Sequence, residues 1–116
     1  MPPIDVLFYE DKNGHVPVID FLKSLNRKME AKVTWTISKL AELGYELREP
    51  YSKPLGDGIF ELRTQLGGDI SRVLYFFMVN GRAVLTHGYI KKTQKTPKSE
   101  IERAKRYRDD FVRREL

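Results

Sequence analysis

The stretch IFELRTQLGGDISRVLYFFMVNGRAVLTHGYI, residues 59–90, decides the fold. It contains three runs rich in β-branched, aromatic and other apolar residues, at Ile59–Leu66, Asp69–Val79 and Ala83–Ile90. Runs of this composition favour strands. The pairs Gly67-Gly68 and Asn80-Gly81 separate the runs, and both pairs favour two-residue hairpin turns. The stretch therefore predicts an antiparallel sheet of three consecutive strands.

The predicted hairpins bring two arginines and a tyrosine into one row. If each turn has two residues, Arg63 lies opposite Arg72, and Arg72 lies opposite Tyr89. Like charges directly opposite each other destabilise a sheet. We therefore interpret the row as an anion site, with both guanidinium groups facing solvent.

Alternation along the strands divides their side chains between two faces. The face expected to form the core holds Phe60, Leu62, Val73, Tyr75, Phe77, Val84, Thr86 and Ile90. The opposite face carries the row together with Glu61, Gln65, His87, Lys91, Ile70, Leu74, Phe76 and Met78.

The residues before the sheet predict one strand and two helices. Ile4–Glu10 favours a first strand. Pro17 opens a short helix, and an apolar repeat that ends at Gly44 predicts a second helix over about residues 27–43. Residues 45–58 contain several Pro and Gly residues and are expected to be irregular.

The last part of the chain predicts a third helix. Thr96-Pro97 suits its cap and first turn, and Ser99 with Glu102 offers an alternative capping box. All these elements together predict a single α+β domain over residues 1–116, with the helices covering one face of a curved antiparallel sheet.

Composition restricts the class of protein. The chain has no cysteine, which removes disulfides, cysteine-zinc sites and thiol nucleophiles. No apolar run approaches the roughly 18 residues of a membrane span, and the N-terminus does not resemble a signal peptide. We expect a cytoplasmic protein with no membrane partner.

The net charge of +5 is unevenly distributed. Residues 1–80 hold ten Lys or Arg and eleven Asp or Glu, whereas residues 81–116 hold eleven and five. A basic C-terminal part favours a polyanion such as nucleic acid. A solvated basic helix would have the same composition.

The row and its surroundings suit the cleavage of RNA without a metal ion. The 2′-OH of RNA is a built-in nucleophile, so the protein has to orient the phosphate, neutralise its charge and move protons. Arg63 and Arg72 would hold the phosphate. Tyr89 and His87 are candidates for proton transfer, provided that cationic neighbours lower the tyrosine pKa. Four lysines would bind the RNA backbone: Lys91, Lys92, Lys95 and Lys98.

Each of these residues also has a structural interpretation. Arg63 would pair with Glu61 or Asp69, Tyr89 would pack in the sheet, and His87 would be structural. The two histidines are far apart and no HExxH motif occurs, so we expect neither a catalytic metal nor another cofactor.

Three segments of the chain resemble a known family: GIFELR at 58–63, SRVLYFF at 71–77 and HGYIKKTQKTP at 87–97. They resemble the phage-derived Gp49-like or HigB-like toxins of the RelE/ParE superfamily, which belong to type II toxin–antitoxin systems. The resemblance implies a compact βααβββα fold. It also implies a ribosome-dependent mRNA endoribonuclease, in which the two arginines contact the scissile phosphate.

The resemblance implies partners as well. A cognate antitoxin, often a helix-turn-helix protein, would block the toxin, and operator DNA would be bound only through the complex of the two. Two other functions stay open. Some members of the superfamily act on DNA gyrase with no ribonuclease activity, and a non-toxic phage accessory protein that binds nucleic acid would share the basic tail.

Overall fold

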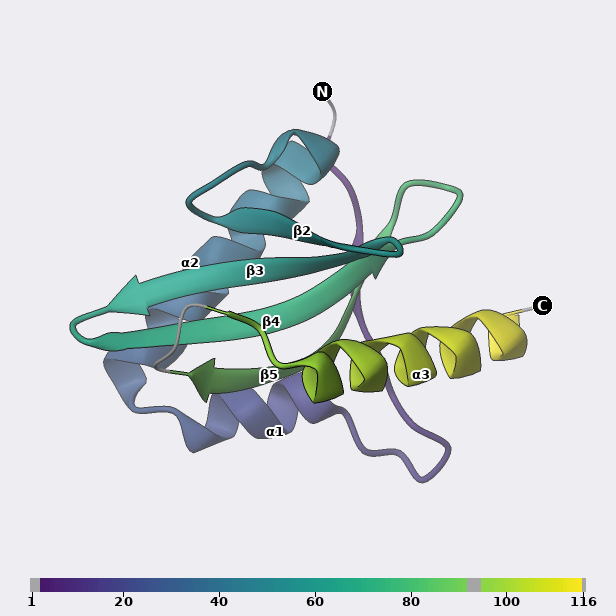
Figure 1. Ribbon diagram of the computed structural model, residues 1–116, viewed down its shortest axis with the longest axis horizontal. Coiled ribbons are helices and arrows are strands. Elements are labelled where there is room, and N and C mark those ends of the chain that lie inside the picture. The colour runs from purple at the N-terminus through teal and green to yellow at the C-terminus, as the bar shows by residue number, and fades with distance from the viewer. Residues whose placement is uncertain (1–2, 92–94, 116) are drawn as a thin grey trace.

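The computed structural model describes residues 3–91 and 95–115 and has the expected α+β class. A five-stranded sheet lies between two helical layers (Figure 1). In chain order the elements are β1 (Val6–Phe8), α1 (Pro17–Ser24), α2 (Arg27–Leu43), a 3₁₀ turn η1 (Gly44–Glu46), β2 (Ser52–Gly56), β3 (Ile59–Leu66), β4 (Asp69–Phe77), β5 (Ala83–Lys91) and α3 (Lys98–Glu115).

The sheet has the strand order β1-β5-β4-β3-β2. Strands β2 to β5 are antiparallel neighbours, whereas β1 pairs with β5 in parallel through Val6 and Ala83. The segment 45–58, expected to be irregular, contains η1 and β2. The sequence thus predicted one strand too few, because Pro54 and Gly56 are tolerated in an edge strand.

The cross-strand row is confirmed. Arg63 pairs with Arg72, and Arg72 pairs with Tyr89. The second turn is one residue longer than expected, since the Met78 amide donates to the Arg82 carbonyl at 2.7 Å. A bulge in the β4–β5 pairing, between Leu74 and Tyr75, restores the predicted register at the row.

The same bulge overturns part of the face assignment. Because the bulge shifts the alternation along β5, Val84 packs on the opposite face from Tyr75, and Leu85 takes the place beside Tyr75. Thr86 lies at the bulge and donates to the Leu74 carbonyl at 3.1 Å. Ile90, also expected in the core, is exposed.

The helices cover both faces of the sheet, not one. α1 and α2 lie behind the sheet in Figure 1, over a cluster that includes Leu62, Val73 and Leu85. α3 lies in front, where Ala104 packs against a second cluster around Leu74. The face that carries Arg72 and His87 is therefore partly covered by α3. In the described part of the chain, no helix is long and apolar enough to cross a membrane.

Gly88 fixes the approach of α1 to the sheet. A Cβ at this position would lie 2.4 Å from the Phe21 ring, far inside van der Waals contact. The missing side chain lets the aromatic ring of α1 pack directly on the β5 backbone. Gly88 is the residue that separates His87 from Tyr89, so this contact also fixes the part of β5 that carries both side chains.

Candidate functional site

A carboxylate lies between the two arginines of the row. Glu61 and Arg63 are two residues apart on β3 and therefore share a face with Arg72 of β4. The Arg72 Nε lies 3.2 Å from Glu61 Oε1, and the Arg63 Nε lies 3.9 Å from Glu61 Oε2. The single negative charge offsets the repulsion between the guanidinium groups. The expected pairing of Arg63 with Glu61 is thus present.

The two arginines differ in their access to solvent. The Arg72 side chain is 0% exposed and Glu61 is 2% exposed, whereas 23% of the Arg63 side chain is exposed. The expectation that both guanidinium groups face solvent is therefore wrong for Arg72. Only Arg63 presents its side chain to an incoming phosphate in this conformation.

The segment that leads into α3 covers the buried arginine. Thr96, which is buried, donates a hydrogen bond from its hydroxyl to Glu61 Oε1 at 2.5 Å. Thr96 was expected to cap α3; its hydroxyl instead holds the carboxylate that binds Arg72. This contact spans 35 residues of sequence, so nothing in the local pattern identifies it.

Tyr89 completes the row with a protonated phenol. Burial raises the pKa of Tyr89, and the negative charge of Glu61 adds to the rise. Hydrogen bonding to Thr96 and the positive charge of Arg72 act in the opposite direction. The expectation that neighbouring cations lower this pKa is wrong, because desolvation outweighs them. The Tyr89 phenol is therefore protonated at neutral pH, and its hydroxyl oxygen is buried in this conformation.

His87 lies buried between β5 and α3. Its Nε2 is 3.3 Å from Glu100 Oε1, and its ring packs edge-on against Tyr107 at 5.7 Å between centroids. Burial lowers the pKa of His87 to about 4; Glu100 opposes the shift, whereas the charges of Arg103 and Arg106 add to it. The imidazole is thus neutral at pH 7 and enclosed by α3.

The buried histidine predicts acid sensitivity. An unfolded histidine has a pKa near 6.5, so the unfolded chain binds a proton between pH 6.5 and 4 that folded His87 does not bind. The free energy of unfolding should therefore decrease as the pH is lowered from 6.5 to 4, by up to about 1.4 kcal/mol per pH unit. Urea unfolding of the wild type and His87→Gln at several pH values measures this slope. Equal slopes in the two proteins would contradict the role of His87.

The four lysines are only partly described. Lys95 and Lys98 are exposed on either side of the start of α3. Lys91 ends β5 opposite Ile70, and Lys92 lies outside the described residues. Among residues 3–91 and 95–115, no group of three or more His, Cys, Asp or Glu side chains could hold a metal ion.

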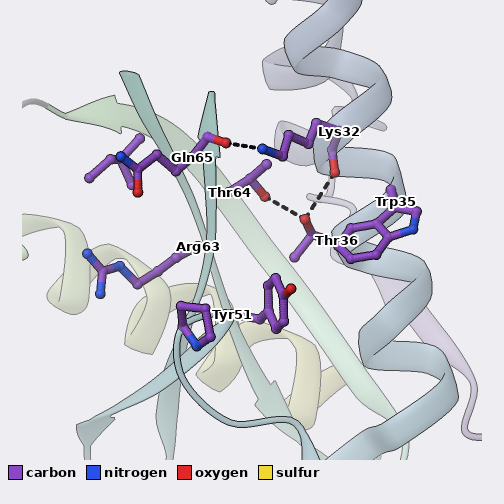
Figure 2. A pocket seen from close by; sticks show the side chains of 9 residues that line it. Lys32, Trp35, Thr36, Tyr51, Arg63, Thr64 and Gln65 are labelled. Atoms are coloured by element: carbon purple, nitrogen blue, oxygen red, sulfur yellow. Dashed lines mark hydrogen bonds between the residues drawn. The ribbon is translucent and has the colours of Figure 1, made fainter. Parts of the chain in front are cut away.

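A pocket of about 380 Å³ adjoins the accessible end of the row. It lies between α2 and the open edge of β3, and its lining includes Lys32, Trp35, Tyr51 and Arg63 (Figure 2). Thr64 and Thr36 join the two elements through a hydroxyl hydrogen bond of 2.9 Å. Trp35 lies outside the series of buried residues on α2 and is exposed, and this offset is the one signal in the sequence that points to the pocket.

Residues 20–109 match the model of the family described as phage derived protein Gp49-like (DUF891). The match begins inside α1 and includes every element from α2 to β5 and most of α3, and therefore the whole row. No curated protein matches the chain.

Proposed function

The chain belongs to the phage-derived Gp49-like family, which is toxin-like, and from this membership we propose that it is the toxin of a type II toxin–antitoxin system. The proposed activity is endoribonucleolytic cleavage of mRNA on the ribosome, in the manner of the HigB-like and RelE-like toxins. No metal ion or other cofactor takes part, because the RNA 2′-OH serves as nucleophile.

The observation that carries the proposal is the guanidinium pair held around Glu61. In the proposed reaction the 2′-OH attacks the adjacent phosphorus, the bond to the 5′-oxygen breaks, and a 2′,3′-cyclic phosphate forms. Negative charge builds on the phosphate oxygens, and Arg63, the exposed member of the pair, neutralises it. Arg72 acts through Glu61 and holds Arg63 in place, so it is a positioning residue.

Proton transfer is assigned according to burial. We propose Tyr89, which desolvation keeps protonated, as the donor to the departing 5′-oxygen. Its hydroxyl oxygen is buried in this conformation, so the role requires that RNA binding exposes it. We place His87 outside the reacting groups, because Glu100 and Tyr107 enclose its ring. The 2′-OH gives its proton to solvent water, because no residue of this chain is assigned as the base.

The basic segment and the antitoxin complete the proposal. Lys91, Lys92, Lys95 and Lys98 bind the RNA backbone or the ribosome through their charge. The antitoxin is a helix-turn-helix protein with an acidic or amphipathic segment that covers this basic surface. The complex of the two, and not the toxin alone, binds operator DNA.

Induced expression followed by primer extension on cellular mRNAs tests the proposal. We expect growth arrest, together with new 5′ ends inside translated regions. Blocking translation initiation on a reporter should remove the cuts from that transcript, because the ribosome delivers the substrate. Harmless expression with intact transcripts would contradict the proposal and favour a non-toxic protein that binds nucleic acid.

A toxin that acts on DNA gyrase is the second candidate. The burial of Arg72 and His87 favours it, because such a toxin needs no phosphate-cleaving face. Growth arrest with intact mRNA and DNA breakage would identify this function in the same expression experiment.

A further inference from the structure

We propose that the pocket between α2 and β3 binds one nucleotide of single-stranded RNA, with its base against Trp35 and Tyr51 and its phosphate at Arg63. The inference deepens the proposed function and rests on it, since it supplies the RNA with a second point of attachment beside the row. The aromatic part of the pocket lies on the α2 side of β3, whereas Arg63 lies on the face that carries the row.

The first argument is the pair of exposed aromatic rings. Trp35 is 44% exposed and Tyr51 is 38% exposed. Their centroids are 5.7 Å apart and their planes meet at 69°, so the two rings form a corner. A flat base placed in such a corner stacks on one ring and meets the edge of the other.

The second argument is charge. Lys32 and Arg63 both line the pocket, and among the described residues that line it there is no carboxylate. The Lys32 ammonium is held at the mouth by the Gln65 carbonyl, 2.5 Å away. Lys39, which pairs with Glu42 on the surface of α2, lies 5.3 Å from the centre of the Trp35 ring. This combination of cations and aromatic rings suits an anionic, aromatic ligand such as a nucleotide.

The third argument is the open edge of β3. β2 pairs with β3 only as far as Leu62, and the Arg63 amide donates to the Tyr51 carbonyl at 2.8 Å. Beyond this point, no strand in the described part of the chain covers residues 64–66 on that side. No strand therefore blocks a ligand at this edge, where the Gln65 carbonyl accepts from Lys32.

Arg63 connects the pocket with the row. In Figure 2 the Trp35 and Tyr51 rings lie toward α2, whereas the Arg63 side chain extends away from Trp35. An RNA strand that crosses the β3 edge would thus place a base on the aromatic side and its phosphate at the guanidinium. The volume of about 380 Å³ lies within the roughly 300–1,000 Å³ of ligand pockets. A base paired in a duplex is not available to enter it.

Trp35 is the only tryptophan in the chain, so its fluorescence reports directly on this pocket. The probe is a short single-stranded 2′-O-methyl oligonucleotide, which cannot be cleaved because its nucleophile is blocked. We expect the oligonucleotide to quench Trp35, a duplex of the same sequence to quench it much less, and heparin, a polyanion without bases, to leave it unchanged. Binding of a labelled copy is followed in parallel by anisotropy.

Tyr51→Ala removes one wall of the corner and keeps the reporter. Its affinity for the oligonucleotide should fall about fivefold or more, as for the loss of one base–aromatic stack. The matched control is Tyr45→Ala, because Tyr45 is also exposed but stacks on Phe77 outside this pocket. Circular dichroism of both variants verifies that they are folded.

Three outcomes would overturn the inference: binding without quenching, equal quenching by heparin, or unchanged affinity in folded Tyr51→Ala. If the antitoxin changes Trp35 emission and no oligonucleotide does, the pocket binds a protein partner, and this result would also overturn the inference. The two proposals fail separately. Binding here without cleavage in cells would contradict only the proposed ribonuclease, and cleavage without binding here would contradict only the pocket.

Discussion

Arg63→Ala should abolish growth arrest and lower mRNA cleavage by about 100-fold or more, the usual cost of losing one group that stabilises transition-state charge. The reason is that Arg63 is the member of the guanidinium pair that reaches solvent. Removing it leaves the phosphorane charge without its proposed counter-charge, while Arg72 stays buried. The measurement is primer extension on a translated reporter, at matched levels of protein.

Arg82→Ala is the matched control for this experiment. Arg82 is also partly exposed and also pairs with one carboxylate, Glu115 at 3.5 Å, but it lies near the turn between β4 and β5. We expect it to keep full toxicity. Arg63→Lys should restore only part of the activity, because an ammonium lacks the forked donors of a guanidinium. A folded Arg63→Ala protein that cleaves mRNA like the wild type would refute the assignment.

The first two helices, α1 and α2, could be predicted from the sequence because the residues that define them lie within or next to each helix. The predicted range 27–43 for α2 agrees with Arg27–Leu43, since the apolar repeat and Gly44 both lie within or next to the helix. The Asn26 side chain caps its other end by accepting from the Met29 amide at 2.8 Å. In contrast, β2 depends on pairing with β3, and its Pro and Gly residues hide it.

The pairing of Arg72 with Tyr89 was predicted correctly only because two deviations from the assumed hairpin cancel. The turn after β4 is one residue longer than assumed, and the bulge beside Leu74 adds one residue on β5 that compensates. Counting from the turn therefore gave the right neighbour for Arg72 but the wrong face for Val84. A bulge leaves little trace in sequence alternation when both faces of a strand are apolar.

The burial of the site was beyond prediction because it depends on distant contacts. Glu61 could be recognised as a neighbour of Arg63 from its spacing of two residues. The covering of Arg72 depends instead on where the chain passes before α3, and Thr96 reaches Glu61 across the sheet. Likewise, the packing of α3 against His87 required knowing that this helix lies on the opposite face from α1 and α2.

The second large effect is expected at Glu61. Glu61→Ala should lower the free energy of unfolding by about 3–5 kcal/mol, the cost of removing one partner of a buried ion pair. The variant takes the carboxylate away from Arg72, whose side chain is 0% exposed. It also removes the acceptor of the Thr96 hydroxyl. Urea unfolding, analysed with a common dependence on denaturant, measures the change.

Glu42→Ala is the matched control for the loss of a carboxylate. Glu42 pairs with Lys39 at 3.4 Å on the surface of α2, and 61% of its side chain is exposed. An exposed pair of this kind contributes at most about 1 kcal/mol. Equal losses of stability in the two variants would show that burial adds nothing to the Glu61 contact.

The double variant Glu61→Leu with Arg72→Met separates stability from function. It removes both buried charges and replaces them with apolar side chains, so its loss of stability should be much smaller than that of Glu61→Ala. If Glu61 and Arg72 serve to hold Arg63 at the phosphate, the folded double variant will still cleave mRNA poorly, and kcat will fall more than KM rises. If the pair is purely structural, the double variant should regain cleavage together with its stability.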